Sequence, residues 1–156
     1  MMITVEAAVA APIEEVWRAW ITPQDIVQWN AASDDWHTTG AAVDLRVGGA
    51  FSSRMEAKDG SVGFDFAGTY TRIEPHRLIE YSLGGDRVVR IEFVAGDEGV
   101  TVRETFTAEP THSEEQQRNG WQAILDRFAR QPVREAYGEK EVKLATARAQ
   151  ACVPRP

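Results

Sequence analysis

The chain has 156 residues, enough for one globular domain that buries a core without help from metals or disulfides. Its hydrophobic content of 43% and charged content of 26% are those of a soluble globular protein, and its net charge of −7 disfavours binding to nucleic acid or to anionic membranes. Cys152 is the only cysteine, so the chain can form neither an internal disulfide nor a cysteine metal cage.

The first thirty residues predict a strand followed by two short helices. Residues 3–7 alternate between apolar and polar side chains, which is typical of a strand. Residues 12–20 begin with proline and continue with apolar side chains at helical spacing. A second helix is expected from Thr22 to Trp29, with Thr22 as N-cap and Asp25 completing the capping interaction.

The middle of the chain predicts a series of short strands. Apolar and polar residues alternate within each run, and Gly, Pro or Asp separates one run from the next. The expected strands cover residues 43–47, 51–55, 62–70, 77–83, 87–95 and 99–106. Short connections make neighbouring strands antiparallel, and one polar face indicates a sheet that is covered on one side only. The side chains assigned to the solvated face include Arg87, Arg90, Glu92 and Arg103.

The last predicted helix, residues 113–131, carries a wide apolar stripe. Ser113 and Gln116 form a capping box at its start. Gly120 lies inside the helix, where glycine costs about 1 kcal/mol relative to alanine, so we expect another backbone to approach it closely. The stripe consists of Trp121, Ile124, Leu125 and Phe128. Burying it requires the sheet, which predicts an α+β fold: a curved antiparallel sheet wraps around the helix and leaves a hollow at the helix end.

Residues 1–131 are expected to form a single domain, and residues 132–156 a separate extension. The extension begins at Pro132 and carries more basic than acidic residues, unlike the acidic domain. We expect it to be mobile or weakly helical. No apolar run is long enough to span a membrane, and the N-terminus lacks the pattern of a signal peptide, so the predicted location is the cytoplasm.

Three motifs on these elements resemble a known family. Residues 44–51 match the pattern D-x-R-x-G-G-x-F, residues 68–75 match G-x-Y-x-x-I-x-P, and residues 120–125 match G-W-x-x-x-L. Together with Trp17 and Trp29, they resemble the helix-grip (SRPBCC) superfamily of START lipid-transfer domains, birch-pollen allergens and polyketide cyclases. Within this superfamily, the motifs resemble one branch, the proteins similar to the C-terminal domain of the activator of the ninety-kilodalton heat-shock chaperone ATPase. The resemblance implies the helix-grip fold and covers residues 1–131.

Taken as a group, apolar and aromatic side chains are expected to line the predicted hollow and contact a ligand, although ordinary core packing is the simpler interpretation of any single one. The candidate ligand-binding residues are Trp29, Phe51, Met55, Phe64, Phe66, Tyr70, Glu104, Trp121, Leu125 and Phe128. Small residues at Gly63, Ala67 and Gly68 are expected to leave volume for the ligand.

Glu104 is the least expected member of this set. It shares a strand face with Val102 and Phe106, so it points inward if they do. A buried carboxyl needs a partner or a raised pKa. Three interpretations stay open: Glu104 anchors a ligand or acts as an acid/base group, it bonds to a structural partner, or the strand end opens to solvent.

His37 is the second candidate catalytic residue. Asp34 and Asp35 lie close to it in sequence, which suggests an acid/base pair or metal ligands. However, adjacent residues on an extended segment point to opposite sides, and no second histidine is near. We therefore expect no metal site.

Three functions remain from the sequence. The first is non-catalytic binding of a small hydrophobic or amphipathic molecule between sheet and helix. The second, from the resemblance alone, is interaction with a chaperone or another stress-related partner. The third is a cyclase or hydrolase that uses Glu104, with His37 or Tyr70. No nucleophile or phosphate-binding motif is present, so no cofactor is expected, nor nucleic-acid binding or stable membrane association. A monomer or weak dimer is predicted.

Overall fold

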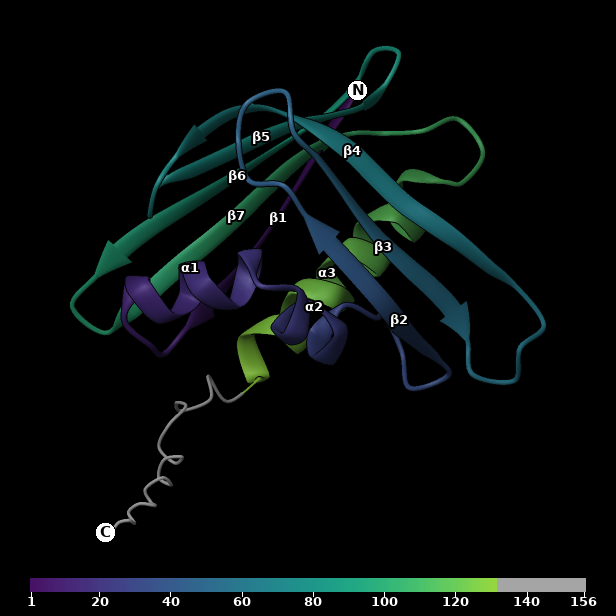
Figure 1. The fold of residues 1–156 in the computed structure, drawn as a ribbon, viewed down its shortest axis with the longest axis horizontal. Helices are drawn as coiled ribbons and strands as arrows, with labels where there is room; N and C mark the ends of the chain where they lie inside the picture. Colours follow the sequence, from purple (N-terminus) through teal and green to yellow (C-terminus); the bar gives the residue numbers. More distant parts are fainter. Residues whose placement is uncertain (132–156) are drawn as a thin grey trace, which may run out of the picture.

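The computed structural model describes residues 1–131, which form seven strands and three helices (Figure 1). The elements in chain order are β1 (Met2–Val9), α1 (Ile13–Ile21), α2 (Pro23–Trp29), β2 (Trp36–Val43), β3 (Ala50–Ala57), β4 (Gly63–Glu74), β5 (Leu78–Gly84), β6 (Arg87–Gly96), β7 (Gly99–Thr107) and α3 (Glu114–Arg130). The predicted extension, residues 132–156, lies outside the described residues.

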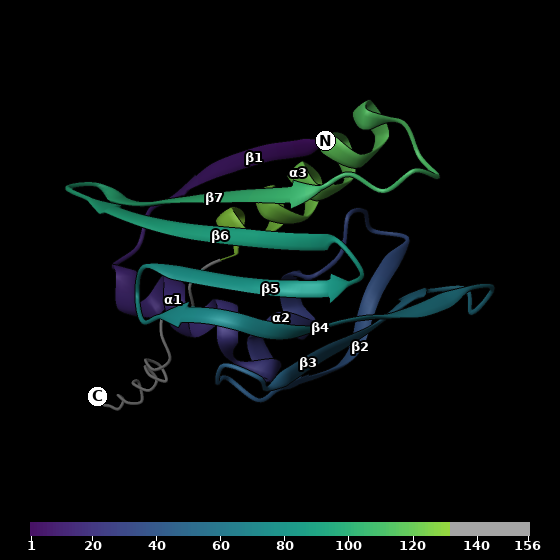
Figure 2. The same ribbon diagram turned by 90° about the horizontal axis from the view of Figure 1, so that it is seen from above.

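All seven strands belong to one antiparallel sheet in the order β1-β7-β6-β5-β4-β3-β2. The sheet curves strongly, and all three helices lie on its concave side, as Figures 1 and 2 show from two directions. The other face is open to solvent and carries charged side chains. This arrangement confirms the predicted helix-grip fold. Within the part of the chain that the structure describes, no helix is both long and apolar enough to cross a bilayer.

The second strand does not lie where the sequence predicted it. Residues 43–47 were expected to be a strand, but β2 ends at Val43 and a loop follows. Hydrogen bonds from the Gly48 amide to the Tyr70 carbonyl (2.8 Å) and from the Tyr70 amide to the Gly49 carbonyl (2.9 Å) bind this loop to β4. Gly48 has a φ of +87°, which interrupts a strand. The alternation here is local and is overridden by these tertiary contacts, and Val47 is left 62% exposed.

The elbow between α1 and α2 forms as expected, except for its cap. Thr22 precedes α2 at the N-cap position, but its side chain makes no capping hydrogen bond, so the predicted capping by the Thr22 side chain is wrong. The Thr22 amide instead donates to the Arg18 carbonyl and closes α1. One residue thus serves as C-cap of α1 and N-cap of α2. The indole N–H of Trp29 braces the elbow by donating to the carbonyl of Ala19 at 3.0 Å.

The long helix α3 begins at the predicted capping box of Ser113 and Gln116. It is fastened to the free edge of β1, because Arg118 donates to the Thr4 carbonyl (3.1 Å) and Gln122 donates to the Glu6 carbonyl (3.0 Å). These bonds also cover edge carbonyls that would otherwise invite a further strand. The expected close backbone approach at Gly120 is wrong, since a Cβ there would meet open space.

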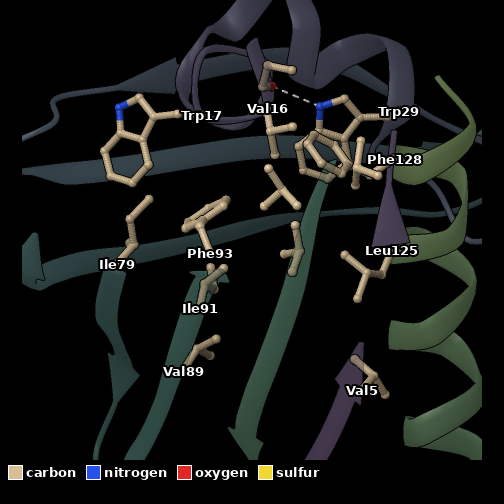
Figure 3. Close-up of a cluster of buried hydrophobic side chains, with 14 of the residues drawn as sticks. Val5, Val16, Trp17, Trp29, Ile79, Val89, Ile91, Phe93, Leu125 and Phe128 are labelled. Atoms are coloured by element: carbon tan, nitrogen blue, oxygen red, sulfur yellow. Dashed lines mark hydrogen bonds between the residues drawn. The ribbon is translucent and has the colours of Figure 1, made fainter. Parts of the chain in front are cut away.

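The packed core lies between the sheet, α1, α2 and the C-terminal half of α3 (Figure 3). The ring centroids of Trp17 and Phe93 are 5.3 Å apart, and Phe128 lies 4.9 Å from Trp29 with its ring edge-on. Ile91 and Leu125 are fully buried. Aromatic pairs at these distances pack as tightly as any protein interior, so this end of the molecule is solid.

Candidate functional site

A hollow of about 480 Å³ lies between the N-terminal half of α3, the elbow of α1 and α2, and strands β2–β7. The side chains predicted to contact a ligand and found in its wall are Trp29, Phe51, Met55, Phe64, Phe66, Tyr70, Glu104 and Trp121. The sequence thus predicted the wall largely from inward-facing apolar alternation. Its volume lies in the range typical of ligand pockets in proteins.

Leu125 and Phe128 were also predicted to contact the ligand, but they do not line the hollow. Leu125 is fully buried, and the ring of Phe128 packs against Trp20 and Trp29 at 4.9 Å each. Both belong to the C-terminal half of α3, which faces the elbow formed by α1 and α2. The apolar stripe is therefore divided: its first half borders the hollow and its second half is closed core.

Stacked and edge-on rings hold the wall in place. Trp121 of α3 stacks on Phe106 of β7 with centroids 3.9 Å apart and an interplanar angle of 11°. Phe66 meets Trp121 edge-on at 6.1 Å, and Phe51 meets Tyr81 at 4.5 Å. These rings come from several elements and support one another, so contacts within the chain fix the shape of the wall.

Small residues on β4 contribute less volume than expected. A Cβ on Gly68 would lie 2.8 Å from the Cε2 atom of Phe51, so the Phe51 ring already occupies that space. The space beside Gly63 is filled by the side chains of Arg54 and Glu56, and only Ala67 lines the hollow. The volume instead arises because α3 lies against β1, which leaves a gap between the helix and the far strands of the sheet.

Phe64 occupies the open side of the hollow. It lies at the tip end of β4, is 47% exposed, and packs on Trp36 with ring centroids 6.0 Å apart. Its exposure arises because the β3–β4 hairpin extends beyond the helices and leaves its tip uncovered (Figure 2). Phe64 therefore marks the entrance.

Glu104 points inward, as the alternation of β7 predicted. It is only 6% exposed and lies in the sheet between Val5 and Ile91. No group among residues 1–131 forms a hydrogen bond or ion pair with its carboxyl, which excludes a structural partner there. Burial raises the pKa of Glu104 to about 8. At neutral pH the carboxyl is mostly protonated and offers one O–H donor and one acceptor to the hollow.

Two tyrosines face the same space with free hydroxyls. Within the described chain, neither Tyr70 nor Tyr81 donates or accepts a hydrogen bond through its side chain. Burial, followed by the charge of Asp44, raises the pKa of Tyr70 to about 12. Burial, followed by the carboxyl of Glu104, raises the pKa of Tyr81 well above its usual value. The interior of the hollow therefore favours neutral groups. Sequence reasoning missed Tyr81, although its alternation with Ile79 indicated an inward position.

Arg87 was assigned to the solvated face, and this assignment is wrong. It lines the hollow from β6, on the same face as Val89 and Ile91. Its Nε atom is buried and has no hydrogen-bond partner among residues 1–131. The period-two pattern of β6 predicts this position. The charge of Arg87 led instead to its assignment to the solvated face.

The other side chains assigned to the outer face are found there. Arg90 pairs with Glu80 at 2.9 Å, and Arg103 pairs with Glu6 at 3.1 Å. Glu92 lies between these arginines, with a closest N–O distance of 3.8 Å to each. The result is a row of alternating charges across β5, β6, β7 and β1.

His37 is not part of the site. It lies on β2 opposite Glu56 and does not line the hollow. Asp34 turns away and binds Arg127 of α3 at 2.8 Å, a hydrogen bond that lowers the pKa of Asp34. The possible grouping of His37 with Asp34 is therefore not formed. In residues 1–131, no three His, Cys, Asp or Glu side chains are placed to hold a metal ion.

Residues 10–131 match the family described as Activator of Hsp90 ATPase homolog 1-like protein. The chain belongs to this family. Through it, the chain also belongs to the helix-grip superfamily, as its fold and motifs indicated. A comparison with curated proteins finds no significant match.

Solved structures of similar proteins agree with this assignment. An AHSA1-like protein from Aeromonas hydrophila is 51% identical, with a TM-score of 0.78 over 83% of this chain and 90% of that one. A protein from Cytophaga hutchinsonii is 42% identical, with a TM-score of 0.72 over 90% of this chain and 94% of that one. A protein from Chromobacterium violaceum is 25% identical, with a TM-score of 0.73 over 82% of this chain and 94% of that one.

The three motifs that carry the family resemblance meet at the hollow. Each contributes one ring to the wall: Phe51 from residues 44–51, Tyr70 from residues 68–75, and Trp121 from residues 120–125. Phe51 and Tyr70 are in contact, with centroids 5.3 Å apart. In this family member, the motif residues thus shape the concave side of the sheet and the helix that faces it.

Proposed function

We propose that this family member binds a small apolar or amphipathic molecule in the hollow between the sheet and α3. The observation that carries the proposal is the combination of an open volume of about 480 Å³ with buried polar groups that have no partner within residues 1–131. Buried polar groups in folded proteins are almost always paired. Glu104, Tyr70 and Tyr81 all face one space, so a single molecule entering it can bond to them.

The lining has many apolar side chains and few polar ones, which supports a ligand that is mostly hydrophobic. Aromatic rings from Phe51, Phe66 and Trp121 offer broad apolar contact area, whereas the polar groups are few and lie at separate points. This combination is typical of sites that gain affinity from apolar burial and orientation from a small number of hydrogen bonds.

The test uses N-phenyl-1-naphthylamine, a neutral apolar fluorophore, titrated into the purified full chain. We expect saturable enhancement of its fluorescence, together with shifts of backbone amide signals in residues 64–70 and 121–128. Ser53→Phe fills the hollow from β3, because Ser53 is 6% exposed and lines it, and should abolish binding. The matched control is Ser52→Phe, whose side chain points to the opposite face of the same strand.

Two results would contradict this proposal. One is the absence of saturable binding to the folded wild-type protein. The other is equal binding by the Ser53→Phe and Ser52→Phe proteins, which would place the probe outside the hollow.

The raised pKa of Glu104 favours a second candidate, acid/base catalysis on a bound substrate. A neutral carboxyl in an apolar pocket can donate a proton at neutral pH. Glu104→Gln keeps the shape of the side chain but cannot transfer a proton. If a substrate is turned over, the Glu104→Gln protein should bind the fluorophore unchanged and lose turnover; retained turnover would exclude Glu104 as the acid.

The family description favours a third candidate, interaction with a chaperone of the Hsp90 class. The charge row of the outer sheet face offers complementary groups, with Arg90 and Glu92 near its centre. A complex at micromolar concentration that is weakened by Arg90→Gln would support this interaction. No complex at that concentration would count against it.

A further inference from the structure

The inner face of β6 begins with a cation that residues 1–131 leave unpaired. Arg87, Val89 and Ile91 alternate along this face, and Arg87 lines the hollow. The buried Nε of Arg87 has no hydrogen-bond partner among the described residues, and none of their carboxylates forms an ion pair with its guanidinium. Guanidinium groups do not lose their charge in proteins, so the positive charge is permanent.

Other arginines of the described chain have carboxylate partners. Arg46 pairs with Asp44 at 3.0 Å. The Nε of Arg127 is also buried without a hydrogen-bond partner among residues 1–131, but its guanidinium pairs with Asp34 at 2.8 Å. A chain with a net charge of −7 has carboxylates in excess, so a lone inward arginine is not explained by a shortage of partners.

Besides Glu104, two carboxyl groups line the hollow, and both are already bound to other groups. Asp65 pairs with Arg54 at 3.5 Å. Glu109 accepts hydrogen bonds from His112 and from the amide of Thr111, and these lower its pKa. Neither is available to Arg87.

Resting on the proposed function, we propose that the ligand is an organic anion whose negatively charged group binds the guanidinium of Arg87 while its apolar body lies against Phe66 and Trp121. A planar guanidinium binds carboxylate, sulfonate and phosphate groups through paired hydrogen bonds. Such a group would satisfy the buried Nε and balance the charge.

The position of Glu104 fixes the orientation of this anion. Arg87 lies beside Gly84 in the sheet, whereas Glu104 lies beside Ile91, four residues further along β6. At about 3.3 Å per residue, the positions of Arg87 and Glu104 along the strand direction are about 13 Å apart. The environment of Glu104 and Tyr81 disfavours negative charge, so the anionic group lies at the Arg87 level and the neutral part extends toward Glu104.

The test compares two probes that differ by one charged group. N-phenyl-1-naphthylamine is neutral, and 1-anilinonaphthalene-8-sulfonate is the same ring system with an added sulfonate. In Arg87→Gln we expect binding of the sulfonate to weaken by about tenfold or more, since a charge-assisted bond is lost. Binding of the neutral probe should change by less than about twofold, because it makes no such bond.

Matched variants locate the effect. Arg90→Gln removes a positive charge from the outer face of the same strand and should leave both affinities unchanged. Arg87→Lys keeps the charge and should retain part of the sulfonate affinity. Ser53→Phe should abolish binding of both probes, which separates binding in the hollow from binding to the surface.

The outcomes separate this inference from the proposed function. If the wild-type protein binds the neutral probe but Arg87→Gln leaves the sulfonate affinity unchanged, or weakens both probes equally, the anion inference is overturned and the proposed function stands. If the wild-type protein binds neither probe in the hollow, the proposed function itself fails. An equal loss in Arg90→Gln would assign the effect to overall charge and would also overturn the inference.

Discussion

The two halves of the interior differ in how they are filled, although one helix runs through both. Toward the C-terminal end of α3, Phe128 packs against Trp20 and Trp29 at 4.9 Å each. Leu125 and Phe128 are buried there (Figure 3). Toward the start of α3, Trp121 stacks on Phe106 and faces open volume. The elbow side chains Trp20 and Trp29 pack against Phe128 on one side and border the hollow on the other, so they separate the closed half from the open half.

The two halves also differ in whether their buried polar groups have hydrogen-bond partners. Trp29 lies where the closed half meets the hollow, and its buried indole N–H donates to the carbonyl of Ala19. In the open half, Glu104, Tyr81 and Arg87 face the hollow without partners among residues 1–131. A packed core satisfies its own polar groups, whereas a binding site keeps some of them for the ligand.

The largest expected difference between the halves is in the cost of truncating a ring. Phe128→Ala should lower the free energy of unfolding by about 3–5 kcal/mol, because it opens a cavity in close-packed core. Phe66→Ala should cost about 2 kcal/mol or less, since Phe66 already borders open space. Urea denaturation of both variants measures the difference; equal costs would contradict the division into solid and hollow halves.

The second expected effect is a pH dependence of the free energy of unfolding that comes from Glu104 in the open half. Its size is on the order of a few kcal/mol. The pKa of Glu104 is about 8 in the folded protein, above its usual value of 4.5. Between these values the folded protein keeps a proton that the unfolded chain has released. The stabilisation is therefore complete below pH 4.5 and is lost as the pH rises through 8.

Glu104→Gln removes this titration, so the variant should be less sensitive to rising pH than wild type. The measurement is the free energy of unfolding of both proteins between about pH 5 and 9. The three histidines are the same in both and cancel in the comparison. Parallel curves would mean that the carboxyl is already ionised in the folded state.

Substitutions at two glycines near the hollow test the space around each of them, and we expect changes of about 1 kcal/mol in the free energy of unfolding. Gly120→Ala should stabilise the protein by about 0.5–1 kcal/mol, because it favours the helix and its Cβ meets open space. Gly68→Ala should destabilise it, since a Cβ there lies 2.7 Å from the Ser82 carbonyl oxygen and 2.8 Å from the Phe51 ring. Thermal melting compares the two; a shift in the same direction for both would contradict the assigned contacts.

The smallest effect is expected on the outer face. Arg90→Gln removes a half-exposed ion pair with Glu80 and should change the free energy of unfolding by less than about 1 kcal/mol. Added salt should weaken the difference further. A cost above about 2 kcal/mol would show that the charge row stabilises the sheet more than exposed pairs usually do.

Much of this architecture could be predicted from local sequence patterns. The capping box of Ser113 and Gln116 set the start of α3, and alternation placed Glu104 inside with Val102. Both depend on neighbours a few residues away, which the sequence displays directly.

The errors share a different cause. Residues 43–47 alternate like a strand, but contacts with β4 hold the residues after Val43 in a loop. Arg87 follows the inward pattern of β6, yet its charge suggested the outer face. Leu125 lies on the same stripe as Trp121, and only the placement of α1 and α2 decides which of them borders the hollow. Such outcomes depend on residues far apart in the chain, and the sequence does not display those pairings.

The most direct test of a half-hollow interior is the indole N–H region of the NMR spectrum during titration with N-phenyl-1-naphthylamine. Trp121 lines the hollow, whereas Trp17 lies in the closed core against Phe93. Saturation should shift the Trp121 indole signal strongly and leave the Trp17 signal in place. An unmoved Trp121 signal, or equal shifts of both, would contradict the account.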